Sequence, residues 1–442
     1  MTKEITPVWE DFANRKLSFN DLPTSWKNLD FRTFNPEKGK TLYDFQVKAL
    51  KQGLTFLYRF EKLRRQSSDY EEAKQKFFGE LNSFSSVDLG NKDFRIRKKD
   101  LGETFHYFEE RYPIQHRTWR SSDIYEVGFQ SLVNRMGYWM ATGSGKTLVA
   151  VKMIELMNEL MEKGEIPERD ILILTQNNIV EQFEGEIEDY NDYHETQIVT
   201  HSLDDLARVK KGGMLPNSGI DVFIDRSDLI TDETKDKQLG FKDIENAGEW
   251  YLFLDEAHKG NTSQSKRQGY FSMLARKGFM FNFSATFTDN IDLVTTIHNF
   301  NLSEFTKAGY GKNTLLSRET LEDFTKDDFS EKEKRKTVLK SLIALTSQKK
   351  ARDQLDQPYH DPLLTCLANS VNIEDSDLEM FFRELERVAT EDRSELFEEA
   401  KEEISESIGS RESYSFSKEE VEWTDIENIS KEDVLEHVFN AE

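Results

Sequence analysis

The sequence MATGSGKT at residues 140–147 carries the residue types that hold the phosphates of a nucleoside triphosphate. Glycines and small side chains let backbone N–H groups approach phosphate oxygens, and the start of a following helix adds a favourable dipole. In this P-loop pattern the Lys146 ammonium neutralises the β- and γ-phosphates and the Thr147 hydroxyl ligates Mg²⁺. We therefore predict ATP and Mg²⁺ as ligands. The predicted nucleotide contacts are Thr142, Gly143, Ser144, Gly145, Lys146 and Thr147.

The segments around this loop have the order that a P-loop requires. Residues 137–140 are a short aromatic strand candidate, and the apolar spacing of residues 147–157 predicts a helix. Met140 stands where the strict pattern has its first glycine. The competing interpretation is a glycine–serine turn that happens to precede a lysine, and the order of strand, loop and helix argues against it.

A pair of adjacent carboxylates follows a second apolar strand. Residues 251–254 predict a buried strand that runs directly into Asp255, Glu256, Ala257 and His258. Two carboxylates at a strand end are costly without a cation. We therefore predict that Asp255 ligates Mg²⁺ and that Glu256 polarises the water that attacks the γ-phosphate, with Lys146 as the third catalytic residue. Alternatively, the acids only stabilise the first turn of a helix.

A third strand candidate, residues 279–283, ends in Ser284, Ala285 and Thr286. We expect the Ser284 and Thr286 hydroxyls to hydrogen-bond the turn that contains His258, which would couple the two segments. In this order and spacing the three motifs resemble the signature of superfamily-two helicases and translocases. The resemblance implies an α/β fold with a RecA-like parallel sheet flanked by helices, together with a helical insertion and the start of a second RecA-like lobe.

Further segments resemble other motifs of that superfamily. Residues 171–178, followed by Gln182 and Phe183, resemble a motif with a strand whose end meets the nucleic-acid backbone, and Thr175 is the predicted phosphate contact. Arg226 and Ser227 follow another strand candidate and either contact nucleic acid or cap a helix, with equal weight for the two readings. Residues 41–46 resemble the glutamine motif, in which the Gln46 amide reads adenine.

The amino-acid sequences of the motifs are most similar to those of the restriction subunit of type III restriction-modification enzymes. The similarity covers roughly residues 130–305 and extends more faintly over residues 362–372, which resemble the opening strand of a second motor lobe. It implies ATP-driven movement on double-stranded DNA, with cleavage by a separate nuclease domain and site recognition by a methyltransferase or specificity partner.

Two elements expected of a complete enzyme are missing from the sequence. No arginine-rich motif that would supply arginine fingers follows residue 371, and no convincing nuclease pattern is present. We therefore expect the amino-terminal motor half of a longer enzyme, or a short subunit that takes its second half from a partner. One hypothesis is an ATP-hydrolysing DNA translocase of restriction or phage-defence type. The other is a nucleotide-binding assembly module without turnover.

The composition sets broad limits on the chain. With 442 residues and a single cysteine, Cys366, the chain has room for several domains and no disulfide framework. The N-terminus has no apolar leader and no run is long enough to span a bilayer, so we expect a cytoplasmic protein without a membrane partner. The net charge of −24 argues against a general polyanion binder. Much of that charge lies in residues 372–442, which hold 24 acidic and 7 basic residues.

Composition shifts along the chain predict five segments. They are an N-terminal arm (1–40), a glutamine-motif segment with a charged helical insertion (41–125), the first RecA-like lobe (126–312), a charged helical connector (313–355), and a partial second lobe with an acidic helical tail (356–442).

Overall fold

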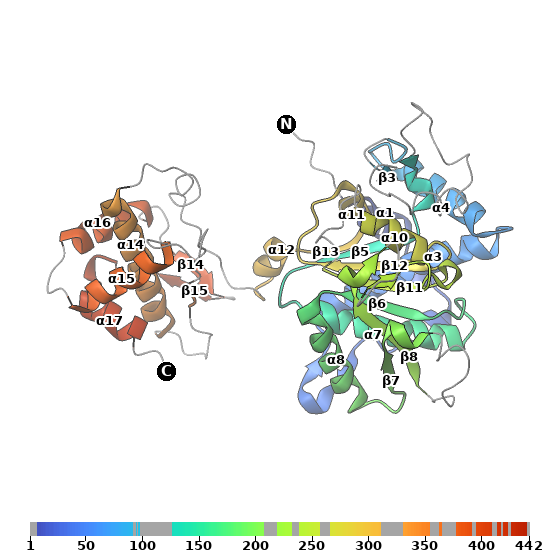
Figure 1. Cartoon of the computed structure of the whole chain (residues 1–442), viewed down its shortest axis with the longest axis horizontal. Helices are drawn as coiled ribbons and strands as arrows, with labels where there is room; N and C mark the ends of the chain where they lie inside the picture. The colour runs from blue at the N-terminus through green and yellow to red at the C-terminus, as the bar shows by residue number, and fades with distance from the viewer. Residues whose placement is uncertain are drawn as a thin grey trace. The chain divides into compact units, whose positions relative to one another are not determined.

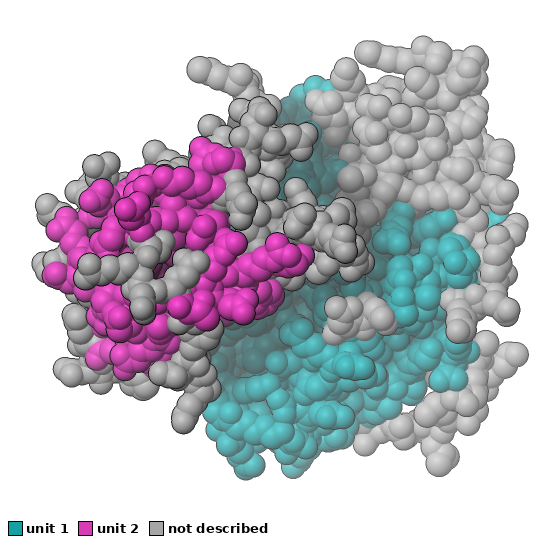
Figure 2. All heavy atoms as spheres, turned by 60° about the vertical axis from the view of Figure 1, so that its left-hand side comes forward, with its two compact units in different colours: residues 1–305 teal, residues 306–442 magenta. Residues whose placement is uncertain are grey.

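The protein divides into two compact units, Met1–Phe305 and Thr306–Glu442 (Figure 2). The structure, a computed structural model, describes residues 7–91, 94, 96–97, 126–206, 219–231, 238–256, 266–310, 330–353, 362–364, 377–390, 395–408, 413–416, 419–422 and 426–439. Each unit has a hydrophobic core of its own, so the two are described separately.

The first unit is built on a seven-stranded sheet in which every neighbouring pair is parallel (Figure 1). The strand order is β13-β5-β12-β11-β6-β8-β7. The strands are β5 (Arg135–Met140), β6 (Ile171–Thr175), β7 (Ile198–His201), β8 (Ile220–Arg226), β11 (Tyr251–Asp255), β12 (Phe279–Ser284) and β13 (Thr296–Phe300). This sheet, flanked by helices, confirms the predicted RecA-like α/β class.

Both faces of the sheet are buried, which explains why its strands read as nearly continuous apolar runs. In β11, Tyr251 and Phe253 join one hydrophobic core, while Leu252 and Leu254 join the other. The alternation follows from the two-residue period of a strand. A sequence with apolar residues at every position of a short run therefore specifies a central strand.

Five helices contribute to the larger core. They are α1 (Val8–Lys16), α3 (Asp44–Arg65), α4 (Tyr70–Phe84), α7 (Lys146–Glu162) and α8 (Asn177–Asn191). The smaller core includes residues of α10 (Lys266–Leu274). Short helices α2 (Thr24–Lys27), α11 (Asn290–Thr295) and α12 (Leu302–Lys307) complete the set of described helices that lie in or begin in this unit.

Several two-residue and three-residue strands form small pairs outside the main sheet. They are β1 (Thr33–Asn35) with β2 (Lys40–Thr41), β3 (Ile96–Arg97) with β4 (Glu126–Val127), and β9 (Ile230–Thr231) with β10 (Leu239–Gly240).

The N-terminal arm packs into the first unit, as its scattered aromatic residues indicate. The Trp9 side chain is fully buried, and its Nε1 donates a hydrogen bond of 2.8 Å to the Arg135 carbonyl at the start of β5. Trp26 Nε1 donates to Glu165 Oε2 at 3.2 Å, near the end of α7. Aromatic side chains bring both a large apolar surface and a polar donor, so the arm is anchored at specific backbone positions.

Asp292 on α11 is a buried acid that makes stability depend on pH. Burial raises its pKa to about 8, the nearby Asp289 charge adds to the effect, and Arg135 and an amide hydrogen bond from Asn282 oppose it. A raised folded-state pKa favours the protonated form, so this stabilising contribution is present at low pH and is lost as the pH rises toward 8.

We expect the free energy of unfolding to fall with pH through this window, by up to about 1.4 kcal/mol per pH unit from this group. Asp292→Asn should flatten the dependence, because asparagine stays neutral. Urea unfolding between pH 5 and 8 checks this, with the exposed Asp21→Asn as the control. An unchanged slope in Asp292→Asn would contradict the assignment.

The second unit contains helices α14 (Glu331–Asp353), α15 (Asp377–Thr390), α16 (Glu395–Ile408) and α17 (Lys431–Phe439), with the antiparallel hairpin β14 (Ser413–Phe416) and β15 (Glu419–Glu422). Helix α14, which falls in the predicted connector, lies in the core of this unit with Leu339, Leu342 and Ile343 buried. Lysines of α14 pair with acids of α16, as Lys336 and Lys340 do with Glu403. The acidic segment is therefore folded where it is described.

The predicted opening strand of a second lobe falls mostly outside the described residues. Residues 362–364 are described and are not in a strand, and residues 365–372 are not described. Among the helices that the structure describes, none is long and apolar enough to cross a membrane.

Candidate active site

The three sequence motifs meet at one edge of the parallel sheet. Strands β5, β12 and β11 are consecutive in the sheet, and they end at Met140, Ser284 and Asp255. Parallel strands present their carboxyl ends at a common edge, which is where α/β folds bind ligands. The fold therefore gathers segments that are far apart in the sequence, with the Ser284 strand between the other two.

The P-loop has a backbone conformation that its glycines make possible. Gly143 has a φ of +78° and Gly145 a φ of +79°, in the left-handed region that L side chains rarely adopt. The Ser144 hydroxyl donates a hydrogen bond of 2.7 Å to the Ala141 carbonyl and closes the turn. Helix α7 begins directly at Lys146, so the loop leads into a helix N-terminus suited to a phosphate.

The two glycines differ in their surroundings, which gives a matched pair of substitutions. A Cβ at Gly143 would meet no atom within 4 Å, whereas a Cβ at Gly145 would lie 2.4 Å from Nε2 of Gln46. We expect Gly143→Ala to lower the free energy of unfolding by roughly 1–2 kcal/mol, the cost of the left-handed conformation. Gly145→Ala should cost about 1 kcal/mol more, because the fixed Gln46 amide must move and lose a hydrogen bond.

Urea unfolding followed by tryptophan fluorescence checks this, since five of the six tryptophans lie in residues 1–305. Adding Gln46→Ala to Gly145→Ala should remove the extra cost, as expected for neighbouring residues that interact. Equal losses for the two glycine variants would show that Gln46 does not restrict Gly145.

The Lys146 ammonium is held by contacts that a phosphate can replace. Its Nζ donates long hydrogen bonds of 3.4 Å to the carbonyl oxygens of Met140 and Ala141. Burial lowers the pKa of Lys146, and the charges of Asp255 and Glu256 act in the opposite direction. The lysine and the two carboxylates thus lie close enough to interact electrostatically.

Asp255 and Glu256 differ in burial and in backbone conformation. The Asp255 residue is only 7% exposed, whereas Glu256 is half-buried. Glu256 also has a φ of +55°, which a residue with a side chain adopts at a cost of roughly 1–3 kcal/mol. Strained residues of this kind persist mainly where function requires a particular side-chain position.

Thr147 and Asp255 supply the kind of oxygen atoms that Mg²⁺ prefers. Thr147 is 6% exposed, and the Gln182 amide of α8 donates to its Oγ1 at 3.5 Å. Mg²⁺ keeps several waters and takes few protein ligands beside substrate phosphates. Within the described ranges, no group of three or more His, Cys, Asp or Glu residues forms a site made by protein alone. The residues present therefore fit Mg²⁺ held together with a nucleotide.

Gln46 lies beside the P-loop, as the glutamine-motif resemblance requires, but its amide already makes two hydrogen bonds within the protein. Its Oε1 accepts a hydrogen bond of 2.8 Å from the Tyr43 backbone N–H, and its Nε2 donates one of 2.8 Å to the Ser144 carbonyl. The first bond caps α3 and the second fixes the loop. Each amide atom keeps one further hydrogen-bonding position, so the adenine contact stays a prediction.

Trp139 connects the P-loop strand to the Ser-Ala-Thr segment, and the sequence motifs did not identify it. Its Nε1 donates a hydrogen bond of 2.9 Å to the Ala285 carbonyl. Ser284 is fully buried, and its hydroxyl both donates to the Thr286 carbonyl and accepts from the Thr286 N–H, each at 3.0 Å. These bonds order the segment locally, while the predicted partner His258 lies outside the described residues.

The predicted nucleic-acid contacts also lie at the carboxyl edge. Thr175 ends β6 and is fully buried. Arg226 ends β8 and makes a two-bond ion pair with Asp228 through Nε (3.1 Å) and Nη2 (2.7 Å), while Ser227 begins a short 3₁₀ turn. In this arrangement the Arg226 guanidinium is held by protein, and nucleic-acid contact by these residues stays a prediction.

A RecA-like parallel sheet with a glycine loop and an acidic strand end defines a P-loop nucleotide-binding domain. Residues 117–289 match the family described as type III restriction enzyme, res subunit, a domain of the superfamily-two helicase type. The match contains the P-loop, the acidic pair and the Ser284–Thr286 segment, and it confirms the predicted resemblance. The search of curated proteins found no match.

This family is a helicase-like ATPase, so residues 117–289 are similar to a motor domain of the kind found in restriction enzymes. The domain family implies use of a nucleotide together with Mg²⁺ and interaction with DNA.

Proposed function

We propose that this chain is the ATP-hydrolysing motor portion of a restriction or phage-defence enzyme that moves along double-stranded DNA. The observation that carries the proposal is the grouping of Lys146, Asp255 and Glu256 at one edge of the sheet, where their charges interact. A lysine, an acidic metal ligand and a base are the groups that phosphoryl transfer to water needs.

In the proposed reaction the P-loop backbone and Lys146 bind and orient the β- and γ-phosphates. Lys146 leaves its long bonds to the Met140 and Ala141 carbonyls for phosphate oxygens. Thr147 and Asp255 would hold Mg²⁺, which offsets negative charge on the phosphates when it is bound. Glu256 orients a water and accepts its proton as that water attacks the γ-phosphate.

We propose that hydrolysis is transmitted to DNA through the carboxyl edge of the sheet. The Trp139 bond to Ala285 joins the strand before the P-loop to the segment after Ser284, so a change in the loop reaches that segment directly. The neighbouring strand ends at Thr175 and Arg226 lie on the same edge and are the proposed DNA-backbone contacts. A methyltransferase or specificity subunit and a nuclease are the proposed partners.

Steady-state ATP hydrolysis by residues 1–442, with and without double-stranded DNA, tests the proposal. We expect turnover that double-stranded DNA increases more than single-stranded DNA or RNA does. Equal turnover without nucleic acid, with double-stranded DNA, with single-stranded DNA and with RNA would contradict the proposal that the protein moves along DNA.

A second candidate is a nucleotide-binding assembly module that does not hydrolyse ATP. It is favoured by the arginines described in the second unit, which are held by carboxylates: Arg383 by Glu379, Arg387 and Arg335 by Glu384, and Arg352 by Asp353. Arg393 and Arg411 lie outside the described residues. ATP binding without turnover in any condition would favour this candidate.

A further inference from the structure

Gln182 on α8 reaches the hydroxyl that is proposed to ligate Mg²⁺. Its Nε2 donates a long hydrogen bond of 3.5 Å to Oγ1 of Thr147. Thr147 is only 6% exposed, whereas Gln182 is exposed, so the amide extends from the surface of α8 to a buried oxygen. Hydrogen bonds at catalytic sites are often long and shorten when the reaction complex forms. The contact therefore joins a helix outside the glycine loop to one atom of the proposed metal site.

A threonine hydroxyl needs such a partner to keep one direction. In a helix the threonine side chain divides between two χ1 rotamers, so the backbone alone does not fix its Oγ1. Helix α7 begins at Lys146, which places Thr147 in the first turn. A hydroxyl oxygen carries two lone pairs, so Oγ1 can accept from the Gln182 amide and still offer a lone pair to a cation. The donating N–H cannot bind a cation, so its effect on the metal acts through Thr147.

The face of α8 that carries Gln182 is held by the β1–β2 hairpin. Glu186 and Asp189 follow Gln182 at i+4 and i+7, which places the three side chains along one side of the helix. Lys40 of β2 pairs with Glu186 at 2.9 Å and also with Asp189. Lys38, between the two strands, pairs with Asp189 at 2.5 Å. Both acidic side chains are 22% exposed, so these ion pairs are partly shielded from water.

Two almost completely buried side chains also join the hairpin to the helices beside the nucleotide site. The Asn35 amide donates a hydrogen bond of 2.7 Å to the Asp189 carbonyl of α8. The Lys152 ammonium of α7 donates one of 2.7 Å to the Thr33 carbonyl. Buried hydrogen bonds to the backbone fix position more firmly than exposed ion pairs do. The hairpin therefore holds α8 at a defined position beside α7.

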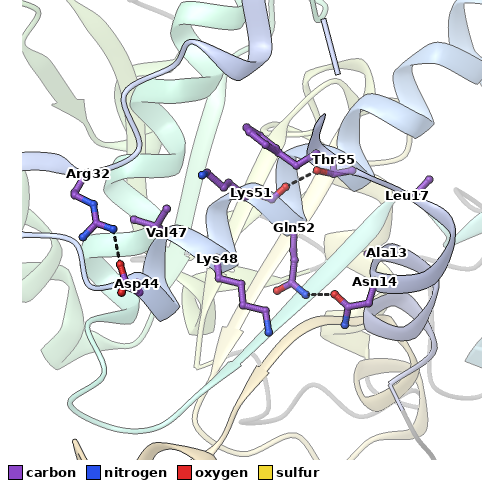
Figure 3. A pocket seen from close by; sticks show the side chains of 11 residues that line it. Ala13, Asn14, Leu17, Arg32, Asp44, Val47, Lys48, Lys51, Gln52 and Thr55 are labelled. Carbon is purple, nitrogen blue, oxygen red and sulfur yellow. Dashed lines mark hydrogen bonds and ion pairs between the residues drawn. The ribbon is translucent and has the colours of Figure 1, made fainter. Parts of the chain in front are cut away.

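The same hairpin leads into the other glutamine that contacts the loop. Arg32, before β1, and Asp44, the first residue of α3, form an ion pair that closes the base of the hairpin (Figure 3). Two residues further on, Gln46 donates to the Ser144 carbonyl. The hairpin thus connects the helix that bears Gln46 with the helix that bears Gln182, and the two glutamines contact the glycine loop and the first turn of α7.

We propose that Gln182 is a positioning residue for the metal-binding hydroxyl of Thr147, and that the β1–β2 hairpin holds it there through Lys38 and Lys40. The inference rests on the proposed function, because it gives Gln182 a role in binding Mg²⁺ together with ATP. Without the Gln182 amide the hydroxyl turns away from the cation for part of the time, so the metal adds less to nucleotide binding. The contacts between the glycine loop and the phosphates do not involve Gln182 and stay unchanged.

Titration of ATP into the full chain, once with excess EDTA and once with saturating Mg²⁺, tests the proposal. The ratio of the two affinities measures how much the metal adds. Gln182→Met keeps the length of the side chain and removes the amide, and we expect it to lower this ratio at least about threefold. Its affinity for ATP in EDTA should stay within about twofold of the parent value. Glu184→Met is the control, because it places the same side chain at an exposed position on the opposite face of α8.

A second variant that combines Lys38→Ala with Lys40→Ala tests the role of the hairpin. We expect it to lower the same affinity ratio, because α8 is then held less firmly. Adding Gln182→Met to this variant should lower the ratio little further, as expected for groups that act together. Circular dichroism confirms that each variant is folded.

An unchanged ratio in Gln182→Met would overturn the positioning role, and so would equal losses in Gln182→Met and Glu184→Met. Fully additive losses of Gln182→Met and the lysine variant would overturn the role of the hairpin. A parent chain that binds ATP equally well with and without Mg²⁺ would instead contradict the proposed metal site itself. Failure of the proposed function is therefore distinguishable from failure of the role given to Gln182.

Discussion

Replacing Lys146 with alanine is expected to reduce the affinity of the chain for ATP at least about thirtyfold, equivalent to about 2 kcal/mol. The Lys146 ammonium donates hydrogen bonds to the P-loop carbonyls, and the charges of the two carboxylates Asp255 and Glu256 act on it. Phosphates brought to this position without the lysine would face Asp255 and Glu256 with less compensating charge. The repulsion between phosphates and carboxylates and the loss of the lysine hydrogen bond therefore both lower the affinity for ATP.

Titration with ATP and Mg²⁺ at low temperature measures this effect as binding, so the result does not depend on turnover. Lys163→Ala is the control, because Lys163 follows the same helix at its far end and forms an exposed pair with Glu159. A Lys146→Ala protein that binds ATP as the parent does would show that the glycine loop is not the nucleotide site.

The strands and the position of the site could be predicted because the signal is local. The apolar runs before Asp255 and Ser284 are short and uninterrupted, as strands buried on both faces must be, and both became neighbouring strands of the sheet. Parallel strands end at one edge, so placing the motifs at strand ends was sufficient to bring Lys146, Asp255 and Ser284 together.

The contacts that sequence reasoning missed are tertiary contacts with no local pattern. Gln182 belongs to the motif that follows residues 171–178, but its contact with the Thr147 hydroxyl arises only because α8 packs against α7. Trp139 reads as one more apolar strand residue, and its bond to Ala285 requires the pairing of β5 with β12. Gln46 was predicted to read adenine, and the structure adds a contact with Ser144 that no spacing could reveal, since the two residues are far apart in the chain.

Replacing Glu256 with glutamine is expected to leave ATP affinity within about threefold and to reduce hydrolysis at least about a hundredfold, the lower range for loss of a general base. Glutamine keeps the size and the polar oxygen of the side chain but cannot accept a proton from water. Single-turnover hydrolysis, with the protein in excess over ATP, is the suitable measurement, because it separates the chemical step from product release. The exposed Glu184→Gln on α8 serves as the control.

The backbone of Glu256 provides an independent test of the same role. Its φ is +55°. A residue with a side chain loses free energy when it adopts this conformation, whereas glycine does not. Glu256→Gly should therefore raise the free energy of unfolding, by about 1 kcal/mol, while abolishing hydrolysis. A purely structural glutamate would give the opposite result, with lower stability on substitution and turnover reduced only in proportion to unfolding. Lys146→Ala acts on binding and Glu256→Gln on the chemical step, so the two variants together distinguish a motor that hydrolyses ATP from a module that only binds it.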